Sequence, residues 1–479
     1  MSLFNLSKTG GCRLKFVSRK RNRRGRRNRG HLKMATRGRL TLWVIAGFFL
    51  FLGFFLLNPT SSTTVVTSLD EVFEETNEPL QEAAPLSAFE AELMKRLPVT
   101  LADYAAFSAN QLLEQESSDP ISESMEGYTI EYSFDRDLTR RVVRLLDRGR
   151  VSDGHIIVLD PQTGRVLAYV STDSDSFPPQ GSYPAASLVK IVTASAALGH
   201  DPKEARRPCL YRGNRYRLSR SSVHRPKSGH SVSLEHALAS SNNRCFAQMA
   251  VDTLGDEVLL EALDRFGWTR SPGPGHSSGS IDRGESDYDL GLLGSGLANT
   301  RITPLHGAQL AASLVSGERL EPWWVDRILD SDQRELTLPA RSEPERIMPS
   351  ATAAEVREML VRTTTHGTAR SAFRDRRGRP RLGKIKVAGK TGNLTGNSPH
   401  GRYEWFVGLA PADDPTVAVA VLQLQSNLWW SKSSELAADL LNEIFCERKK
   451  CAAELADRFT GNLGGAVAPV LLSDPRVSP

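Results

Sequence analysis

The sequence predicts an α/β (α+β) protein with one N-terminal transmembrane helix, and three observations lead to this class. Two pairs of extended apolar segments lie far apart in the chain, at residues 155–171 and 404–425. The residues between them have mainly helical patterns, including the Ala-rich stretch 183–198. An unbroken apolar run precedes all of this at residues 40–57. Strands at both ends of a domain suit a central sheet whose first and last strands come from opposite ends of that domain.

The first 39 residues form a basic tail. The chain has 479 residues, of which 40% are hydrophobic and 24% charged, an ordinary globular composition with room for a large core. The net charge of +6 is uneven, because residues 1–39 hold 14 Lys and Arg and no Asp or Glu. The other 440 residues therefore sum to −8, and the basic excess belongs to the tail alone.

The apolar run from Leu40 to Leu57 is expected to be an uncleaved membrane anchor. As a helix, its 18 residues would span roughly 27 Å, close to the hydrocarbon thickness of a bilayer. No Ala-x-Ala-like cleavage site follows it. The positive-inside rule keeps the tail in the cytoplasm and puts residues 58–479 on the periplasmic side of the cytoplasmic membrane. The tail can also bind anionic lipids, whereas nucleic-acid binding is not expected, since no such motif accompanies it.

Local patterns divide the remainder of the chain. Residues 58–80 have the composition of a flexible stalk, and residues 87–116 have a helical pattern that Pro98 breaks. The stretch "DPQTG" supplies turn chemistry for a hairpin over 155–171. After Cys451 we expect a frayed tail with no core of its own. The expected divisions are the basic tail 1–39, the anchor 40–57, the stalk and membrane-proximal segment 58–126, the catalytic region 127–448 and the C-terminal tail 449–479.

Five cysteines bear on redox state and metal binding. Cys12 falls in the tail, while Cys209, Cys245, Cys446 and Cys451 would face an exterior that permits disulfides. Three pairings are possible, proximity favours 209–245 and 446–451, and all four thiols could also be free. A 446–451 bridge requires a helix break, because one helix would place the two thiols about 140° apart. No Cys/His spacing is typical of a zinc site, and we expect no metal and no cofactor.

The stretch "YPAASLVKIVTASAAL" (183–198) places Lys190 inside an apolar helical run. Burying an ammonium group is costly, so a buried lysine tends to lose its proton. Ser187 lies three residues earlier, on the same face of the helix. A hydroxyl beside a neutral amine is a nucleophile beside a base. The alternative is an ordinary helix whose lysine reaches out to water.

Two further motifs favour the chemical interpretation. "ALASSNNRCF" holds Ser241 and Asn243, and "VAGKTGNLTG" holds Lys390-Thr391-Gly392. Ser-x-x-Lys, Ser-x-Asn and Lys-Thr-Gly in this order occur in penicillin-binding proteins and serine β-lactamases. Ser240 with Asn242 also fits the second motif.

On these residues, and on "GSGLANTRITPLHGAQLAA", "HGTARSAF" and "EWFVGLAP", residues 127–448 resemble the transpeptidase domain of penicillin-binding proteins, the serine DD-peptidases of the penicillin-recognising family. The family's frame around Ser-x-Asn selects Ser241 and Asn243. The resemblance implies a central, mainly antiparallel sheet flanked by helices, with an all-helical subdomain. It also implies D-Ala-D-Ala stem peptides as acyl donors, peptidoglycan cross-linking as the reaction, and β-lactams as inhibitors.

The resemblance and the chemistry imply roles for the site residues. Ser187 is expected to form an acyl-enzyme, with Lys190 as its base. Ser241 would relay the proton to the leaving amine, and Asn243 would hold Lys190 or the substrate amide. Lys390 would supply positive charge and attract a terminal carboxylate. The remaining substrate contacts fall on Thr391, Gly392 and Asn393, and the N–H groups of Ser187 and Asn393 would bind the oxyanion. Asn393 departs from the family, which usually has Thr there.

Other functions remain open from the sequence. Water as acceptor would give a DD-carboxypeptidase or endopeptidase. A β-lactamase is disfavoured, because Asn242 stands where the class A motif has Asp. A cell-wall scaffold or β-lactam sensor would keep the fold without turnover. The short membrane-proximal part has no room for a glycosyltransferase module, so such an enzyme is a possible partner.

Overall fold

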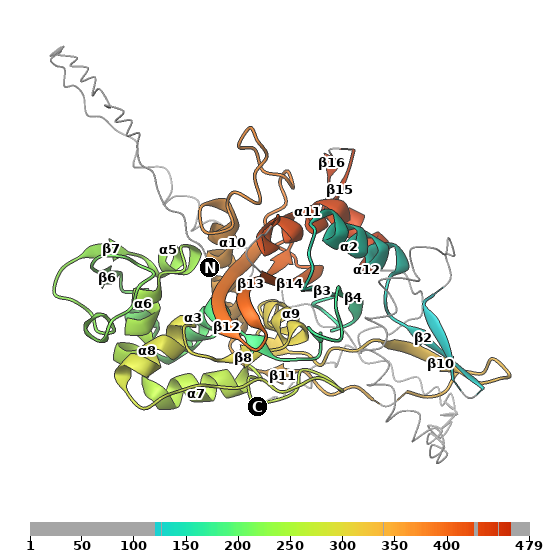
Figure 1. The fold of residues 1–479 in the computed structure, drawn as a ribbon, viewed down its shortest axis with the longest axis horizontal. Coiled ribbons are helices and arrows are strands. Elements are labelled where there is room, and N and C mark those ends of the chain that lie inside the picture. Colours follow the sequence, from blue (N-terminus) through green and yellow to red (C-terminus); the bar gives the residue numbers. More distant parts are fainter. Residues whose placement is uncertain (1–119, 126, 339, 426–429, 449, 461–479) are drawn as a thin grey trace, which may run out of the picture. The chain divides into compact units, whose positions relative to one another are not determined.

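The computed structural model describes residues 120–125, 127–338, 340–425, 430–448 and 450–460. At its centre is a five-stranded sheet with the order β12-β13-β14-β3-β4, antiparallel throughout (Figure 1). Its strands are β3 (Gly154–Leu159), β4 (Val166–Ser171), β12 (Ala388–Asn397), β13 (His400–Ala410) and β14 (Val417–Gln425). Because β14 pairs with β3, the two ends of the domain meet in one sheet, as the sequence predicts.

Alternate residues of the central strands face two separate hydrophobic cores. On β3, Ile156 and Val158 face one core, and Ile157 and Leu159 face the other. Side-chain direction alternates along a strand, so a strand buried on both faces is apolar at every position. This explains the unbroken apolar runs in the sequence.

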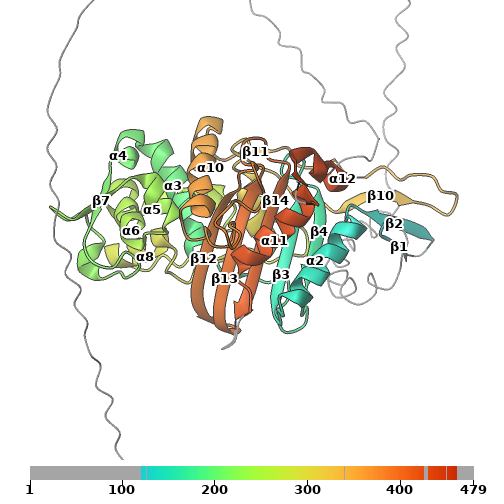
Figure 2. The same ribbon diagram turned by 90° about the horizontal axis from the view of Figure 1, so that it is seen from above.

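Helices cover both faces of the sheet. Two helices cover one face: α2 (Arg136–Arg148), which Asp135 caps by accepting from the Leu138 N–H at 2.6 Å, and α11 (Ser433–Phe445). On the other face α9 (Pro304–Ala312), which starts at a Thr303 cap, packs on β3, β13 and β14. Figure 2 shows α2 and α11 lying across the strands.

A mainly helical region lies beyond β12, at one end of the sheet in Figure 2. It carries the residues of the predicted Ser-x-x-Lys and Ser-x-Asn motifs. Its elements are η1 (Ala186–Leu188), α3 (Val189–His200), α4 (Pro202–Arg206), η2 (Arg220–Ser222), α5 (Leu234–Ala239), α6 (Asn243–Gln248), η3 (Met249–Leu254), α7 (Gly255–Arg265), α8 (Asp287–Ser295) and α10 (Ser350–Thr365).

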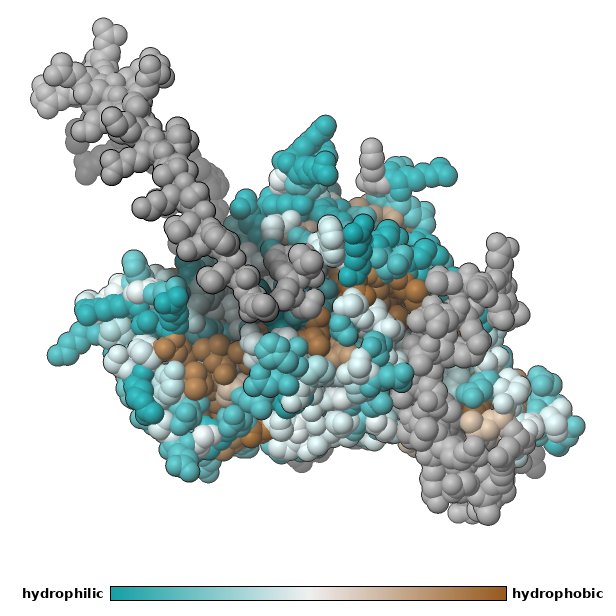
Figure 3. All heavy atoms as spheres, in the orientation of Figure 1, coloured by the Kyte–Doolittle hydropathy of each residue, from teal (hydrophilic) through white to brown (hydrophobic). Residues whose placement is uncertain are grey.

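Short strands complete the described structure. A three-stranded sheet joins β1 (Ser122–Met125), β2 (Tyr128–Tyr132) and β10 (Val325–Leu329). Two-stranded pairs are β5 (Tyr183–Pro184) with β8 (Arg301–Ile302), β6 (Cys209–Tyr211) with β7 (His230–Val232), β9 (Glu318–Arg319) with β11 (Glu345–Arg346), and β15 (Cys446–Glu447) with β16 (Lys450–Cys451). On the face shown in Figure 3, apolar side chains gather near the middle and hydrophilic ones toward the edges.

Two disulfides settle the pairing that the sequence left open. Cys209 bonds to Cys245, and Cys446 bonds to Cys451. The second bridge forms because α11 ends at Phe445 and the chain turns into the β15–β16 hairpin. This is the helix break that such a bridge requires.

One expectation is wrong at the C-terminal end. Residues after Cys451 are not frayed from the start, because η4 (Ala453–Ala456) and α12 (Asp457–Thr460) follow the hairpin. Ala456 and Phe459 are buried in the same core as α2 and α11. The packed structure therefore extends past residue 448, the predicted end of the catalytic region.

Several predictions lie outside the described residues. They are the basic tail 1–39, the anchor 40–57, the stalk 58–80 and the helical pattern of 87–116. Within the described part of the chain, no helix combines the length and the apolar character that a membrane span requires.

Candidate active site

Ser187 and Lys190 lie one turn apart where η1 runs into α3. The Lys190 side chain is fully buried. Its Nζ lies 2.7 Å from Ser187 Oγ, 2.8 Å from Asn243 Oδ1 and 2.6 Å from the Ser295 carbonyl oxygen. The lysine does not reach out to water, so the buried interpretation of the sequence is confirmed.

These three contacts determine which atoms accept the hydrogens of the Lys190 amine and which atom faces its lone pair. The Ser295 carbonyl only accepts. The Asn243 amide nitrogen donates to the Tyr216 carbonyl at 2.8 Å, which turns Oδ1 toward Lys190. A neutral amine has two hydrogens and one lone pair, so donating to these two oxygens leaves the lone pair for the Ser187 hydroxyl. Burial, helped by the charge of Lys390, holds the pKa of Lys190 well below its usual range.

The Ser295 carbonyl is a site component that sequence reasoning missed. It is available because α8 ends at Ser295, where carbonyl groups lack partners within the helix. Gly296 follows with φ of +73°, and a Cβ there would lie 2.0 Å from the Ala186 carbonyl oxygen. Only glycine lets this helix end lie against Ser187. In the sequence, the Gly-x-Gly stretch at 294–296 was the feature that could have indicated this close approach.

Ser241 and Lys390 form a second buried pair. Lys390 Nζ lies 3.1 Å from Ser241 Oγ and 2.7 Å from the Thr391 carbonyl oxygen. Burial lowers the pKa of Lys390 to about 7, so this lysine holds its full positive charge only below neutral pH. The expected positive charge of Lys390 therefore depends on pH in the neutral range.

The structure favours the Ser241 register of the second motif. Asn243 reaches Lys190 and Ser241 reaches Lys390. Asn242 instead caps α6 by accepting from two backbone N–H groups, and the Ser240 hydroxyl donates to the His236 carbonyl at 2.7 Å. Ser241 has φ of +52°, which is strained for a residue with a side chain and is typical of functional sites.

The third motif lies on β12, an edge strand of the sheet, beside η1. Gly392 is buried there, and a Cβ would lie 3.3 Å from the Ala185 carbonyl oxygen. Thr391 Oγ1 lies 2.6 Å from Thr368 Oγ1, a contact that the sequence did not single out. Asn393 is exposed. All the predicted site residues therefore come from η1, α3, α5–α6 and β12, and they meet along one edge of the sheet.

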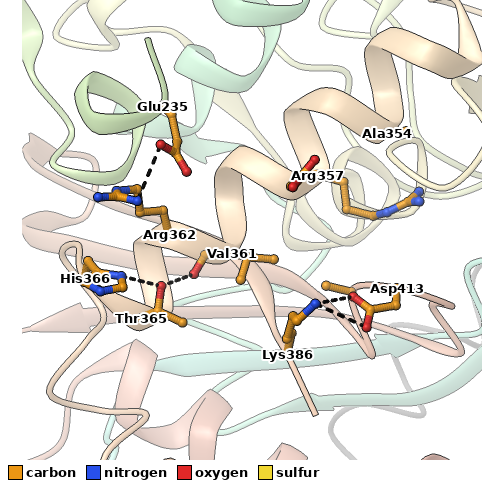
Figure 4. A pocket seen from close by; sticks show the side chains of 11 residues that line it. Glu235, Ala354, Arg357, Val361, Arg362, Thr365, His366, Lys386 and Asp413 are labelled. Atoms are coloured by element: carbon orange, nitrogen blue, oxygen red, sulfur yellow. Dashed lines mark hydrogen bonds and ion pairs between the residues drawn. The ribbon is translucent and has the colours of Figure 1, made fainter. Parts of the chain in front are cut away.

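Figure 4 shows a hollow of about 420 Å³ that has no part in this arrangement. Its cations already have partners, since Lys386 lies 3.3 Å from Asp413 and Arg362 lies 3.5 Å from Glu235. None of the predicted site residues lines it. In the described ranges, no group of three His, Cys, Asp or Glu side chains is placed to hold a metal ion.

Comparison with known proteins shows which chains this one resembles in sequence. The chain is 26% identical over 318 residues to peptidoglycan D,D-transpeptidase PbpA of Mycolicibacterium smegmatis, an alignment that covers 56% of this chain and 61% of the relative. It is 23% identical over 346 residues to stage V sporulation protein D of Bacillus subtilis, covering 64% of this chain and 51% of the relative. The matched region thus spans about half to three fifths of the length of these curated relatives.

Solved structures share the fold at low sequence identity. Penicillin-binding protein A from Mycobacterium tuberculosis, in its ceftriaxone acyl-enzyme complex, matches with a TM-score of 0.53 and 22% identity, covering 65% of this chain and 78% of that one. Pseudomonas aeruginosa PBP2 matches with a TM-score of 0.56 and 23% identity, covering 68% and 81%. The model of the penicillin binding protein transpeptidase domain matches residues 154–445, well over half of the chain. This chain therefore belongs to the penicillin-binding protein transpeptidase family.

Proposed function

We propose that this protein is a serine-type peptidoglycan D,D-transpeptidase that forms an acyl-enzyme at Ser187 from D-Ala-D-Ala stem peptides. One observation carries the proposal. The lone pair of the buried Lys190 amine is left for Ser187 Oγ, 2.7 Å away, because Asn243 and Ser295 accept its hydrogens. The names of the curated relatives, peptidoglycan D,D-transpeptidases, support the substrate class.

Acylation starts with proton transfer from Ser187 to Lys190. The Ser187 oxygen then forms a bond to the carbonyl carbon of the penultimate D-Ala. Collapse of the tetrahedral intermediate breaks the bond from that carbon to the nitrogen of the terminal D-Ala, and the nitrogen takes up a proton. This proton is the one that Lys190 took from Ser187, so Lys190 is neutral again after D-Ala leaves. We assign the relay to Ser241, whose hydroxyl is positioned by Lys390 Nζ at 3.1 Å. Backbone N–H groups of Ser187 and Asn393 would stabilise the oxyanion.

The carboxylate of the terminal D-Ala would bind beside Lys390 and Thr391. A bound carboxylate favours the charged form of Lys390, since an opposite charge raises the pKa that burial has lowered to about 7. Thr391 can donate its hydroxyl to this carboxylate while it accepts from Thr368, 2.6 Å away.

A fluorescent penicillin tests the nucleophile. The purified protein should be labelled covalently, and Ser187→Ala should abolish the label. Ser240→Ala is a matched control, because its hydroxyl donates to the His236 carbonyl and takes no part in the site. Labelling of Ser187→Ala would place the nucleophile elsewhere.

Turnover decides between transfer and hydrolysis. With a peptide donor and an added amine, a transpeptidase gives the amide product, whereas a carboxypeptidase gives only the free acid. A protein that is acylated by penicillin but turns over neither donor nor β-lactam would be a scaffold or sensor. Steady hydrolysis of the β-lactam would indicate a β-lactamase.

We also propose a single-pass anchor at residues 40–57, with the catalytic domain on the periplasmic side. The bridges Cys209–Cys245 and Cys446–Cys451 support this, because disulfides persist in oxidising compartments. The basic tail would then meet anionic lipids, and a cell-wall glycosyltransferase is a fitting partner. A reporter fused after residue 479 should be active only if it works outside the cytoplasm, and cytoplasmic-only activity would overturn this topology.

A further inference from the structure

A hollow of about 480 Å³ opens beside the candidate site. The connection from α10 to β12 lines it, with His366, Gly367, Thr368, Arg370, Ser371, Arg374 and Asp375. Thr368 links the hollow to the site, because its Oγ1 lies 2.6 Å from Thr391 Oγ1. A substrate group bound at Thr391 therefore has the hollow as its neighbour.

The wall of the hollow is fixed relative to Ser241. The backbone N–H of Thr368 donates to the Ala239 carbonyl at 3.1 Å, at the end of the helix that leads into Ser241. A Cβ at Gly367 would lie 2.2 Å from the same carbonyl oxygen, so only glycine allows this close approach. The hollow is thus held in place by the chain segment that carries the second motif.

The hollow has a surplus of positive charge. Arg370 is exposed, and no charged partner of its side chain occurs among the described residues. Arg374 donates from Nη1 to the Gly378 carbonyl at 2.6 Å, and its Nε is buried without a hydrogen-bond partner in the described structure. The one carboxylate that lines the hollow, Asp375, accepts from Arg379 Nε at 2.8 Å. The backbone N–H of Arg379 and then this side chain lower the pKa of Asp375.

We propose that this hollow binds a carboxylate of the acyl acceptor. This carboxylate is at the end of the acceptor's side chain and not on the carbon that bears the attacking amine. The inference rests on the proposed transpeptidase function and adds the acceptor to it. The acceptor amine approaches the acyl carbon from the side on which the amine of D-Ala departed. Its carbon skeleton therefore lies where D-Ala lay, beside Thr391, and continues into the hollow past Thr368. Guanidinium groups match carboxylates in geometry and charge.

The transfer step needs no groups other than the acceptor amine, Ser187 and Lys190. The neutral acceptor nitrogen forms a bond to the acyl carbon, and the bond from that carbon to Ser187 Oγ breaks. The proton that the nitrogen loses returns to Ser187 Oγ through the Lys190 amine, 2.7 Å away. The hollow takes no part in these bonds, so Arg370 is a specificity residue and not a catalytic one.

The test compares acceptors that differ only in the charge of the side chain. The full-length protein is acylated with a depsipeptide donor that ends in D-lactate, so that no competing amine is released. D-Glutamate and the longer D-2-aminoadipate are then offered alongside their uncharged side-chain amides. The measurement is the ratio of amide product to hydrolysed acid. Both products come from the same acyl-enzyme, so this ratio does not depend on the rate of acylation.

Three substitutions read out the contribution of Arg370. We expect wild type to prefer at least one acidic acceptor over its amide by about 2- to 5-fold, the size of an exposed ion pair, and less at high salt. Arg370→Gln should bring the preference close to 1, and Arg370→Lys should retain most of it. Arg376→Gln is the matched control, since Arg376 is exposed on the same connection but does not line the hollow, and it should leave the preference unchanged.

The outcomes separate this inference from the proposed function. If wild type prefers neither acidic acceptor, or if Arg370→Gln keeps the wild-type preference, the acceptor site is wrong while acyl transfer stands. If penicillin does not acylate Ser187, the proposed function itself fails.

Discussion

Replacing Lys190 with arginine tests whether Lys190 acts as a general base or only supplies positive charge. The lysine can act as a base because burial and Lys390 lower its pKa well below the usual range. A guanidinium keeps its proton, since its pKa stays above about 12. Arginine could still donate to Asn243 and Ser295, but it would have no lone pair for the Ser187 hydroxyl. Lys190→Arg therefore keeps a positive charge at this position but removes the group that can take the proton from Ser187.

The expected loss follows from the geometry around Lys190. The 2.7 Å contact with Ser187 Oγ is a direct one, within the range for a positioned general base. Loss of such a base costs about 10² to 10⁴ in rate, which corresponds to about 3–5 kcal/mol of transition-state free energy. We expect the acylation rate constant of Lys190→Arg to fall by this factor.

Acylation kinetics with a fluorescent penicillin measure the effect, and thermal unfolding confirms that each variant is folded. Lys384→Arg is the control, because Lys384 is exposed and should tolerate the change without loss of rate. A rate for Lys190→Arg within about threefold of wild type is far smaller than the loss of a base predicts. That result would refute the assignment of Lys190 as the base.

Two further predictions follow from single residues. Gly296→Ala should lower the acylation rate and destabilise the fold by about 1–3 kcal/mol, because its Cβ would lie 2.0 Å from the Ala186 carbonyl oxygen. Gly199→Ala is the control in thermal unfolding: it has open space around the new atom inside α3, so it should stabilise slightly, by up to about 1 kcal/mol. Lys390→Met should abolish acylation yet raise the melting temperature at pH 7. Burial lowers the pKa of Lys390 from 10.5 to about 7, so the unfolded chain binds more protons in this range and wild-type stability rises with pH. The gain should therefore shrink between pH 7 and 10, and a gain that does not depend on pH would contradict the lowered pKa.

The sequence was a good guide where spacing along one element determines a contact. Ser187 and Lys190 lie on one helical turn, so their proximity follows from helix geometry. The hairpin over 155–171 follows from its turn chemistry, and the paired strands at 404–425 follow from a near-continuous apolar run. The structure confirms both.

Contacts made by backbone groups or by distant segments could not be predicted in the same way. Every residue has a carbonyl group, so the sequence does not identify the one at Ser295 as a partner of Lys190, although the Gly-x-Gly stretch indicates a close approach there. Thr368 meets Thr391 only because the 366–375 connection is anchored to Ala239. The lowered pKa of Lys390 could not be predicted either, because its burial depends on tertiary packing. Phe459 shows the same limit, since a short apolar segment has no periodic pattern that predicts its packing.

The pairing of β14 with β3 constrains how the domain can be made. Residues 154–159 acquire their partner strand, 418–423, only after nearly the whole domain has been synthesised. Contacts between such distant parts of a chain slow folding, because a long loop must close first. During this interval the β3–β4 hairpin has an unpaired edge, which is a risk for aggregation. Lys390 lies on β12, which joins this sheet through β13 and β14, so we expect fragments that end before β14 not to react with a β-lactam.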